Sequence, residues 1–112
     1  YAPKVDRATA RIEWAHPSVV VENFIRGMDA VPGAWSEFEG QPVKLFRPVA
    51  DPEVVLDGPP GTIEEADRDT GVLVATAEGA VRIREVQPQG KRRMEAGAWI
   101  LGRGATAGQR FE

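Results

Sequence analysis

The sequence has no cysteine and only one histidine, His16, among its 112 residues. Without cysteine the chain has no disulfide bond, no thiolate metal ligand and no thiol nucleophile. One histidine cannot provide a metal site built from several histidines. The longest apolar runs are three to four residues, as at 19–21, whereas a membrane-spanning helix needs about 20. We therefore expect a single domain with no metal, no membrane-spanning segment and no membrane partner.

Acidic residues only slightly outnumber basic ones, but the charges are unevenly distributed along the chain. The net charge is −3, which argues against a simple nucleic-acid-binding domain, because such domains usually have a strongly basic face. However, the segment 51–79 has eight acidic residues and one basic residue, whereas 91–112 has five basic and two acidic residues. Outside 51–79 the chain is therefore net positive, and its net charge alone does not exclude a basic binding face.

The first predicted helix begins near Pro17, because proline is well suited to the first turn of a helix. Apolar residues then recur every three to four positions, and the helix ends between 27 and 29. We interpret the apolar stripe as a core-packing face. Its centre is expected to be Val20, Phe24 and Met28, with Val21 and Ile25 beside them.

Short alternating or apolar segments separated by turn residues predict strands. Turns are expected at 39–40, 67–71 and 78–79, and the proline-rich segment 51–60 is expected to be a loop. Five or six short strands with two helices favour a mainly β fold, arranged as a small barrel or sandwich. The expected strands are 10–14, 35–38, 43–46, 62–66, 72–76 and 80–86.

A second, short helix is predicted at 94–101, before a glycine-rich end of the chain. Gly102 is placed to end this helix, and Gly97 would weaken it. The segment 102–108 lacks the Lys-Ser/Thr pair of a phosphate-binding loop. We therefore expect 102–108 to be a flexible tail.

The histidine and the carboxylates do not combine into a catalytic pattern. His16 precedes a proline at a strand-to-helix junction, where a structural or exposed role is expected. Alternation along a strand would point Glu64 and Glu65 to opposite faces, which is poor geometry for shared acid–base catalysis. Asp67 and Asp69 lack the later ligands of a calcium loop and favour a solvated turn. The sequence therefore predicts no active site in this chain.

The basic residues form a denser pattern than the acidic ones. Alternation along 80–86 would place two arginines on an outer face, opposite Val81 and Ile83. Such a stripe would contact phosphates and give salt-dependent affinity without sequence specificity. An ordinary solvated face has the same pattern, and the residues alone leave both interpretations open. The five basic residues are Arg82, Arg84, Lys91, Arg92 and Arg93.

Aromatic side chains are a second class of nucleic-acid contact, because a ring can stack on a base. Here each ring lies in an apolar pattern, which favours a position in the core for most of them. The residues concerned are Trp14, Phe24, Trp35, Phe38, Phe46 and Trp99.

Six short blocks occur in a characteristic order and spacing. Together with the ending GQRF (108–111), they cover essentially the whole chain. In this order the blocks resemble the C-terminal domain of methionyl-tRNA formyltransferase. They are YAPK (1–4), ARIEW (10–14), NFIRG (23–27), VPGAW (31–35), PGT (60–62) and VQPQGKRRM (86–94).

The resemblance implies an open, OB-like β barrel at 9–112, with 1–8 as the remnant of an interdomain linker. It also implies a covalently linked N-terminal catalytic domain and a cytoplasmic protein. That domain would transfer the formyl group of 10-formyltetrahydrofolate to the methionine carried by initiator tRNA. The domain in hand would be non-catalytic, would bind no cofactor of its own, and would help to hold the tRNA.

The resemblance also indicates which residues would contact RNA. Lys4, Lys91, Arg92 and Arg93 lie in matched blocks, whereas Arg82 and Arg84 come from the strand pattern alone. The acidic segment 51–79 would have to face away from the RNA.

Two further inferences concern Arg26 and a competing family. A partly buried arginine on a core helix needs acceptors, so Arg26 is expected to have a structural hydrogen-bonding role. The blocks around 25–35 are also similar to 10-formyltetrahydrofolate dehydrogenase, a formyl hydrolase, and to small-amine formyltransferases. In those families the domain would have a structural, non-RNA role. The block at 86–94 favours the tRNA enzyme.

Overall fold

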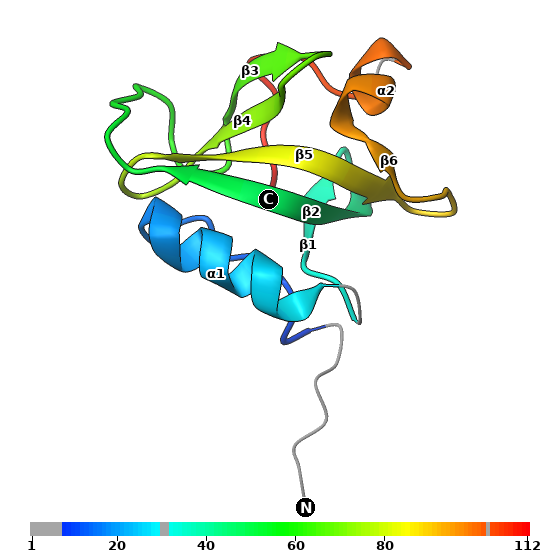
Figure 1. Cartoon of the computed structure of the whole chain (residues 1–112), viewed down its shortest axis with the longest axis horizontal. Helices are drawn as coiled ribbons and strands as arrows, with labels where there is room; N and C mark the ends of the chain where they lie inside the picture. Colours follow the sequence, from blue (N-terminus) through cyan, green and yellow to red (C-terminus); the bar gives the residue numbers. More distant parts are fainter. Residues whose placement is uncertain (1–7, 30–31, 103) are drawn as a thin grey trace, which may run out of the picture.

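The computed structural model describes residues 8–29, 32–102 and 104–112, so Lys4 and all but the last residue of the predicted linker lie outside the described residues. The described chain is mainly β, with two short helices (Figure 1). This confirms the predicted fold class. The elements in chain order are α1 (Ser18–Met28), β1 (Trp35–Phe38), β2 (Gln41–Asp51), β3 (Ile63–Asp67), β4 (Gly71–Ala75), β5 (Ala80–Pro88), β6 (Met94–Glu95) and α2 (Ala96–Leu101).

The strands form one antiparallel sheet in the order β1-β2-β5-β4-β3. The long strand β5 pairs along one edge with β2, and its other edge is shared by β4 and β6. The sheet is curled into a barrel-like shape. It is open, because no strand pairing between β1 and β3 closes the described sheet. The predicted turn at 39–40 is confirmed, because Glu39 and Gly40 both have positive φ angles, 53° and 78°, as a tight hairpin turn requires.

Helix α1 covers the part of β2 that β1 leaves unpaired. Strand β1 pairs only with 41–44 of β2. Beyond this point the carboxylate of Glu22 accepts a hydrogen bond from the backbone N–H of Ala50 at 2.9 Å, and Arg26 donates to the carbonyl of Pro48 at 3.0 Å. The predicted hydrogen-bonding role of Arg26 is thus confirmed, although its side chain is exposed and not partly buried as expected. The helix blocks an exposed strand edge that would otherwise pair with other chains.

The predicted helix is confirmed, but the centre of its buried face is wrong by one position. Val21 and Ile25 are fully buried, whereas Val20 is 48% exposed. Phe24 and Met28 are only partly buried at the side of the core. The helix lies against the edge of β2 as well as the sheet, and this contact rotates its buried face toward Val21.

The predicted strand at 10–14 is also wrong. The segment makes only an isolated bridge between Arg11 and Trp35. Its alternation is nevertheless real, because Ala10, Ile12 and Trp14 are buried. The side chains therefore follow the expected pattern although the backbone has a neighbour for only a short stretch.

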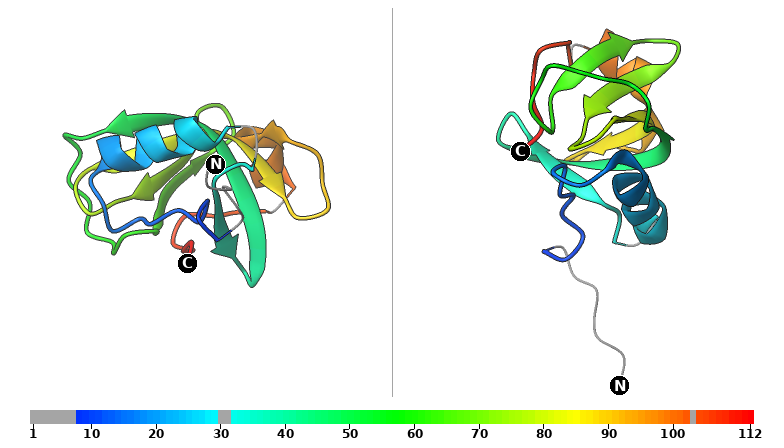
Figure 2. Two further views of the ribbon diagram at one scale, coloured as in Figure 1. Left: turned by 90° about the horizontal axis from the view of Figure 1, so that it is seen from below. Right: turned by 90° about the vertical axis from the view of Figure 1, so that its left-hand side faces the viewer.

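The prediction that 102–108 is a flexible tail is wrong for the part of this segment that the structure describes. Ala105 is 1% exposed, and the backbone N–H of Gly108 donates to the carbonyl of Ile63 at 2.8 Å. The residues that follow also pair with the barrel. Glu112 and Glu37 of β1 each donate a backbone hydrogen bond to the other, at 2.8 and 3.0 Å. On the other side, Phe111 donates to the carbonyl of Gly61, and Ile63 of β3 donates to that of Gln109, both at 2.8 Å. The segment therefore bridges the gap between β1 and the start of β3 (Figure 2, red).

Phe111 explains why this segment is ordered against the barrel. Its side chain is 1% exposed, and its ring centre lies 5.2 Å from Phe38, 5.6 Å from Trp14 and 6.2 Å from Trp99. The core position predicted for Trp14, Phe38, Phe46 and Trp99 is confirmed. Burying an aromatic ring among other rings supplies enough apolar contact to fix a glycine-rich segment.

The second helix is shorter than predicted, because Met94 and Glu95 pair with β5 as strand β6. Gly102 follows the helix, as expected. Gly97 is needed for packing, since a Cβ atom there would clash with the carbonyl oxygen of Arg68. No helix in the described ranges has the length and apolar character needed to cross a membrane.

Replacing Phe111 by alanine should lower the free energy of unfolding by about 3–5 kcal/mol, because the variant leaves a cavity at the centre of the aromatic cluster. Chemical denaturation of the 112-residue chain measures this change. Val55, which is 90% exposed, provides the control, and Val55→Ala should change stability by less than about 0.5 kcal/mol. A Phe111→Ala variant as stable as the control would contradict the closing role of the C-terminal segment.

Candidate nucleic-acid interface

The turn between β5 and β6 is held by hydrogen bonds within itself. The backbone N–H of Lys91 donates to the carbonyl of Pro88 at 3.0 Å. The side-chain amide of Gln87 donates to the carbonyl of Lys91 at 3.1 Å. Gly90 has a φ angle of +77°, a conformation that glycine adopts without strain. Lys91 and Arg92 are exposed on this ordered turn.

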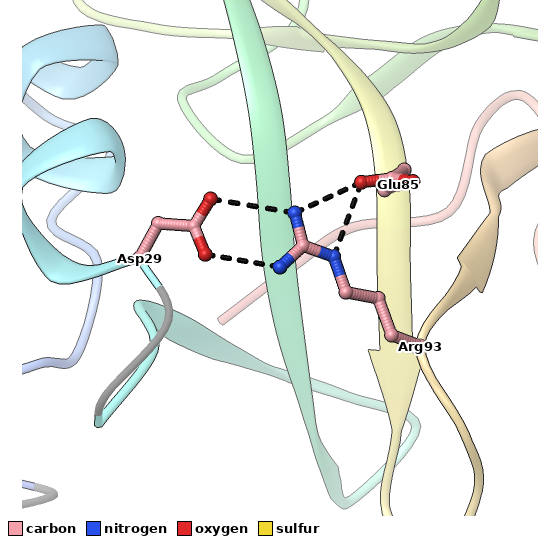
Figure 3. Close-up of polar contacts among 3 residues, drawn as sticks. All are labelled: Asp29, Glu85 and Arg93. Carbon is pink, nitrogen blue, oxygen red and sulfur yellow. Dashed lines mark hydrogen bonds and ion pairs between the residues drawn. The ribbon is translucent and has the colours of Figure 1, made fainter.

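Arg93, the last residue of the turn, points instead to two carboxylates (Figure 3). Its Nη1 and Nη2 atoms donate to Asp29 at 3.0 and 3.3 Å, and its Nε and Nη2 atoms donate to Glu85 at 3.1 and 2.9 Å. The guanidinium carbon lies 3.8 Å from the centre of the Phe46 ring. All three guanidinium nitrogens therefore have a carboxylate partner, and the planar group also covers an aromatic face.

The network of Arg93, Asp29 and Glu85 joins three parts of the chain. Burial by itself would lower the pKa of Arg93, but hydrogen bonds and charge from Asp29 and Glu85 outweigh it and raise the pKa above the usual value. Asp29 follows the last residue of α1, and Glu85 lies on β5. The network thus fixes the start of β6 relative to the helix and the sheet, and it anchors the exposed turn.

The alternation predicted for β5 is confirmed in its first half. Val81 and Ile83 are fully buried, and Arg84 is exposed on the opposite face. Arg82 lies on that face too, but its guanidinium donates to Glu65 and to the hydroxyl of Thr70, both at 3.1 Å. Arg82 therefore neutralises one carboxylate of the acidic segment.

Arg47 is a basic residue that the sequence pattern missed. It is exposed, and it lies between the register pairs Phe46–Glu85 and Pro48–Ile83, which places it opposite Arg84. The missed signal was the length of the strand: β2 extends to Asp51, whereas the apolar run 43–46 suggested an earlier end. Neither Arg47 nor Arg84 has an ion-pair partner within 8–29, 32–102 and 104–112.

The six residues predicted to contact RNA thus divide into three groups. Lys4 lies outside the described residues. Arg82 and Arg93 are paired with carboxylates. Arg84, Lys91 and Arg92 are exposed and, among the described residues, have no side-chain hydrogen bond or ion pair. Contact with RNA stays a prediction for all six.

The loop that follows β2 holds two of the eight acidic residues of 51–79, Glu53 and Asp57, and it lies at the opposite end of the sheet from the turn between β5 and β6. In Figure 1 the loop that follows β2 is at the left, and the turn between β5 and β6 is at the right.

The turn between β3 and β4 is closed by the carboxylate of Asp67, which accepts hydrogen bonds from the backbone N–H groups of Asp69 and Thr70 at 2.7 and 3.0 Å. These bonds lower the pKa of Asp67 and confirm the solvated turn.

The described residues contain no cluster of three or more side chains that could bind a metal ion. His16 is exposed.

Comparison with known proteins identifies the fold. The family "Formyl transferase, C-terminal domain" matches residues 4–104. The chain belongs to this family. The resemblance that the sequence blocks indicated is thereby confirmed.

Similar proteins carry the formyltransferase C-terminal domain as part of a longer chain. Methionyl-tRNA formyltransferase of Thiobacillus denitrificans is 39% identical over 111 residues, and that of Thermobifida fusca is 41% identical over 113. Each match covers 99% of this chain but only 36% and 35% of the relatives. The chain thus spans about a third of their length.

A solved structure also contains the formyltransferase C-terminal fold. HypX from Aquifex aeolicus, in complex with tetrahydrofolic acid, superposes with a TM-score of 0.72 at 29% identity. The match covers 92% of this chain and 18% of that chain. The same fold therefore occurs in a protein whose name does not mention tRNA.

Replacing Arg93 by glutamine should lower the free energy of unfolding by about 1–2 kcal/mol, because it removes two partly exposed ion pairs and the contact with Phe46. Denaturant unfolding of the two single variants Arg93→Gln and Arg92→Gln measures the difference. The neighbouring Arg92→Gln should change stability by less than about 0.5 kcal/mol. Equal stability of the two variants would contradict the anchoring role of Arg93.

Proposed function

We propose that this chain is the RNA-binding C-terminal domain of a methionyl-tRNA formyltransferase. The domain helps to hold initiator tRNA, and it is not itself catalytic. A linked N-terminal domain transfers the formyl group of 10-formyltetrahydrofolate to the amino group of the charged methionine. Two methionyl-tRNA formyltransferases are 39% and 36% identical to this chain over 99% of its length, which supports this assignment.

The proposal depends on the exposure of two cations on the turn between β5 and β6. Lys91 and Arg92 are exposed and have no carboxylate partner among the described residues, whereas the adjacent Arg93 has two. Unpaired cations on an ordered turn contact phosphates at a smaller conformational cost than cations on a mobile segment. Arg84 and Arg47 add two exposed charges from the neighbouring strands β5 and β2.

The distribution of acidic residues is compatible with this surface. The loop that follows β2 lies at the opposite end of the sheet from the basic turn (Figure 1). Glu65 is paired with Arg82, and Glu85 and Asp29 are paired with Arg93. These three carboxylates repel phosphates less than free carboxylates would, because each is partly neutralised.

A second function has an observation in its favour. The similarity to HypX and the net charge of −3 suit a structural module that never binds RNA. Such a module would belong to a formyl hydrolase or dehydrogenase, or to a formyltransferase acting on a small amine. It would support the catalytic domain through packing alone, and the exposed cations would be an ordinary solvated surface.

The double variant Lys91→Ala/Arg92→Ala should bind initiator tRNA on the order of tenfold more weakly than the unmodified chain, because two phosphate contacts are lost. Equilibrium binding at low salt measures this. The double variant Arg68→Ala/Arg110→Ala is the matched control, since it removes the same charge at two other exposed sites.

The two outcomes separate the candidate functions. Equal weakening in both double variants would reduce the interaction to overall charge and contradict the proposed surface. Absence of tRNA binding by the unmodified chain would favour the structural module.

A further inference from the structure

One side of α1 is exposed and uncharged. Val19 and Val20 are 47% and 48% exposed, and Asn23 and Gly27 are exposed beside them. Residues three or four positions apart are neighbours on a helix surface, so these four residues form one face, the outer face of α1. Arg26, the only charged residue that the bounds of α1 leave exposed, is directed to the edge of β2. A surface helix usually has charged residues on its solvent side, and the outer face of α1 instead has the composition of a contact surface.

A groove lies beside this face, between α1 and the segment 11–16. Its volume is about 150 Å³, roughly that of an apolar cavity that accepts a benzene-sized group. Val20, Val21 and Phe24 line it from the helix, and Ile12 lines it from the segment. The groove can therefore accept one large apolar side chain of a partner.

The glycine on the outer face is not required by the packing of this domain. Gly27 does not have a positive φ angle, and a Cβ atom there would meet no atom of the described residues within 4 Å outside its own helix. Glycine is unfavourable within a helix, where alanine or glutamine would be better. It does, however, let another surface approach the backbone closely. A partner that lies close against the outer face of α1 accounts for a glycine at this position.

Resting on the linked N-terminal domain of the proposed function, we propose that the outer face of α1 and the groove beside it dock that domain. Val19 and Val20 pack against an apolar patch of the N-terminal domain, and one of its large apolar side chains enters the groove. Helix α1 then joins the two domains, because its opposite face packs in the core through Val21 and Ile25.

The position of the groove favours the linked domain as the occupant. The family is a C-terminal domain, and the chain spans about a third of its relatives, so in those relatives most of the chain precedes this domain. A preceding domain joins through 1–8, and the nearby segment 11–16 forms one wall of the groove. The linked domain therefore reaches the outer face of α1 through a short connection.

Size and charge argue against two other occupants. Separate molecules usually need an interface of about 1,200–2,000 Å² to bind stably, whereas a tethered partner has a high effective concentration, so a small surface is sufficient. One helix face and one small groove therefore suit a tethered domain better than a second copy of the chain. Besides His16, the groove is lined by one basic and one acidic residue, Arg11 and Glu13, so it has no excess of positive charge to attract RNA phosphates.

The test compares the parent protein, in which this chain is joined to its N-terminal domain, with the 112-residue chain. This chain has no cysteine, so Val20→Cys places a single thiol at the groove, and peptide mapping follows its labelling in both proteins. Labelling should be at least about tenfold slower in the parent protein, because a docked face reacts only in the fraction of molecules that are open. Leu101→Cys is the matched control, an exposed apolar position on α2, which lies away from α1 (Figure 1), and its rate should be the same in both proteins.

A change at Gly27 gives the second measurement. Gly27→Gln should leave the 112-residue chain at least as stable as before, because glutamine favours a helix and its Cβ atom meets open space. In the parent protein the longer side chain holds the two surfaces apart. Combined with Val20→Cys, it should return the labelling rate to that of the 112-residue chain.

Several results would overturn the docking proposal. They are equal labelling of Val20→Cys in the two proteins, equal slowing of Leu101→Cys, and protection that survives Gly27→Gln. Labelling of the 112-residue chain that speeds up on dilution would assign the face to a second copy, and labelling of the parent protein that slows only when tRNA is added would assign it to RNA. Both of these results also contradict the proposal.

The docking proposal and the proposed RNA-binding surface fail separately. If Val20→Cys is labelled equally in both proteins but Lys91→Ala/Arg92→Ala weakens tRNA binding, docking is wrong and the proposed function stands. If Val20→Cys is protected in the parent protein but tRNA binding ignores Lys91→Ala/Arg92→Ala, docking stands and the proposed RNA-binding surface is wrong.

Discussion

The arrangement of the basic surface depends on the paired guanidinium group of Arg93. It binds Asp29 after α1 and Glu85 on β5, and it covers the ring of Phe46 on β2. Because a guanidinium group is planar and carries five N–H donors, it can satisfy two carboxylates at once. In a run of three cations, one is therefore used for structure, and Lys91 and Arg92 stay exposed on a turn of defined shape.

Local patterns predicted most of the fold, and long-range contacts account for what they missed. β1 has its predicted bounds, and α1 and the main turns agree closely with the expected positions, because each depends on neighbouring residues. The bridging C-terminal segment could not be predicted in this way. Its order comes from Phe111, which packs on Trp14, Phe38 and Trp99. None of these three residues is close to Phe111 in the sequence.

The same distinction applies to the candidate site. Composition and alternation identified the basic stretch, but they could not separate paired from unpaired cations. The partner of Arg82 is 17 residues away, and Asp29 is 64 residues from Arg93. The family resemblance predicted tRNA as the partner, whereas the structure identified Lys91 and Arg92 as the exposed cations of the turn.

The central claim is that Lys91 and Arg92 contact RNA phosphates. The salt dependence of tRNA binding tests it most directly, because each phosphate contact releases counterions and contributes about 0.7–0.9 to the slope of log affinity against log salt. The account predicts that Lys91→Ala/Arg92→Ala makes this slope less steep by about 1.4 to 1.8. An unchanged slope in the double variant would contradict the claim, whatever its affinity at a single salt concentration.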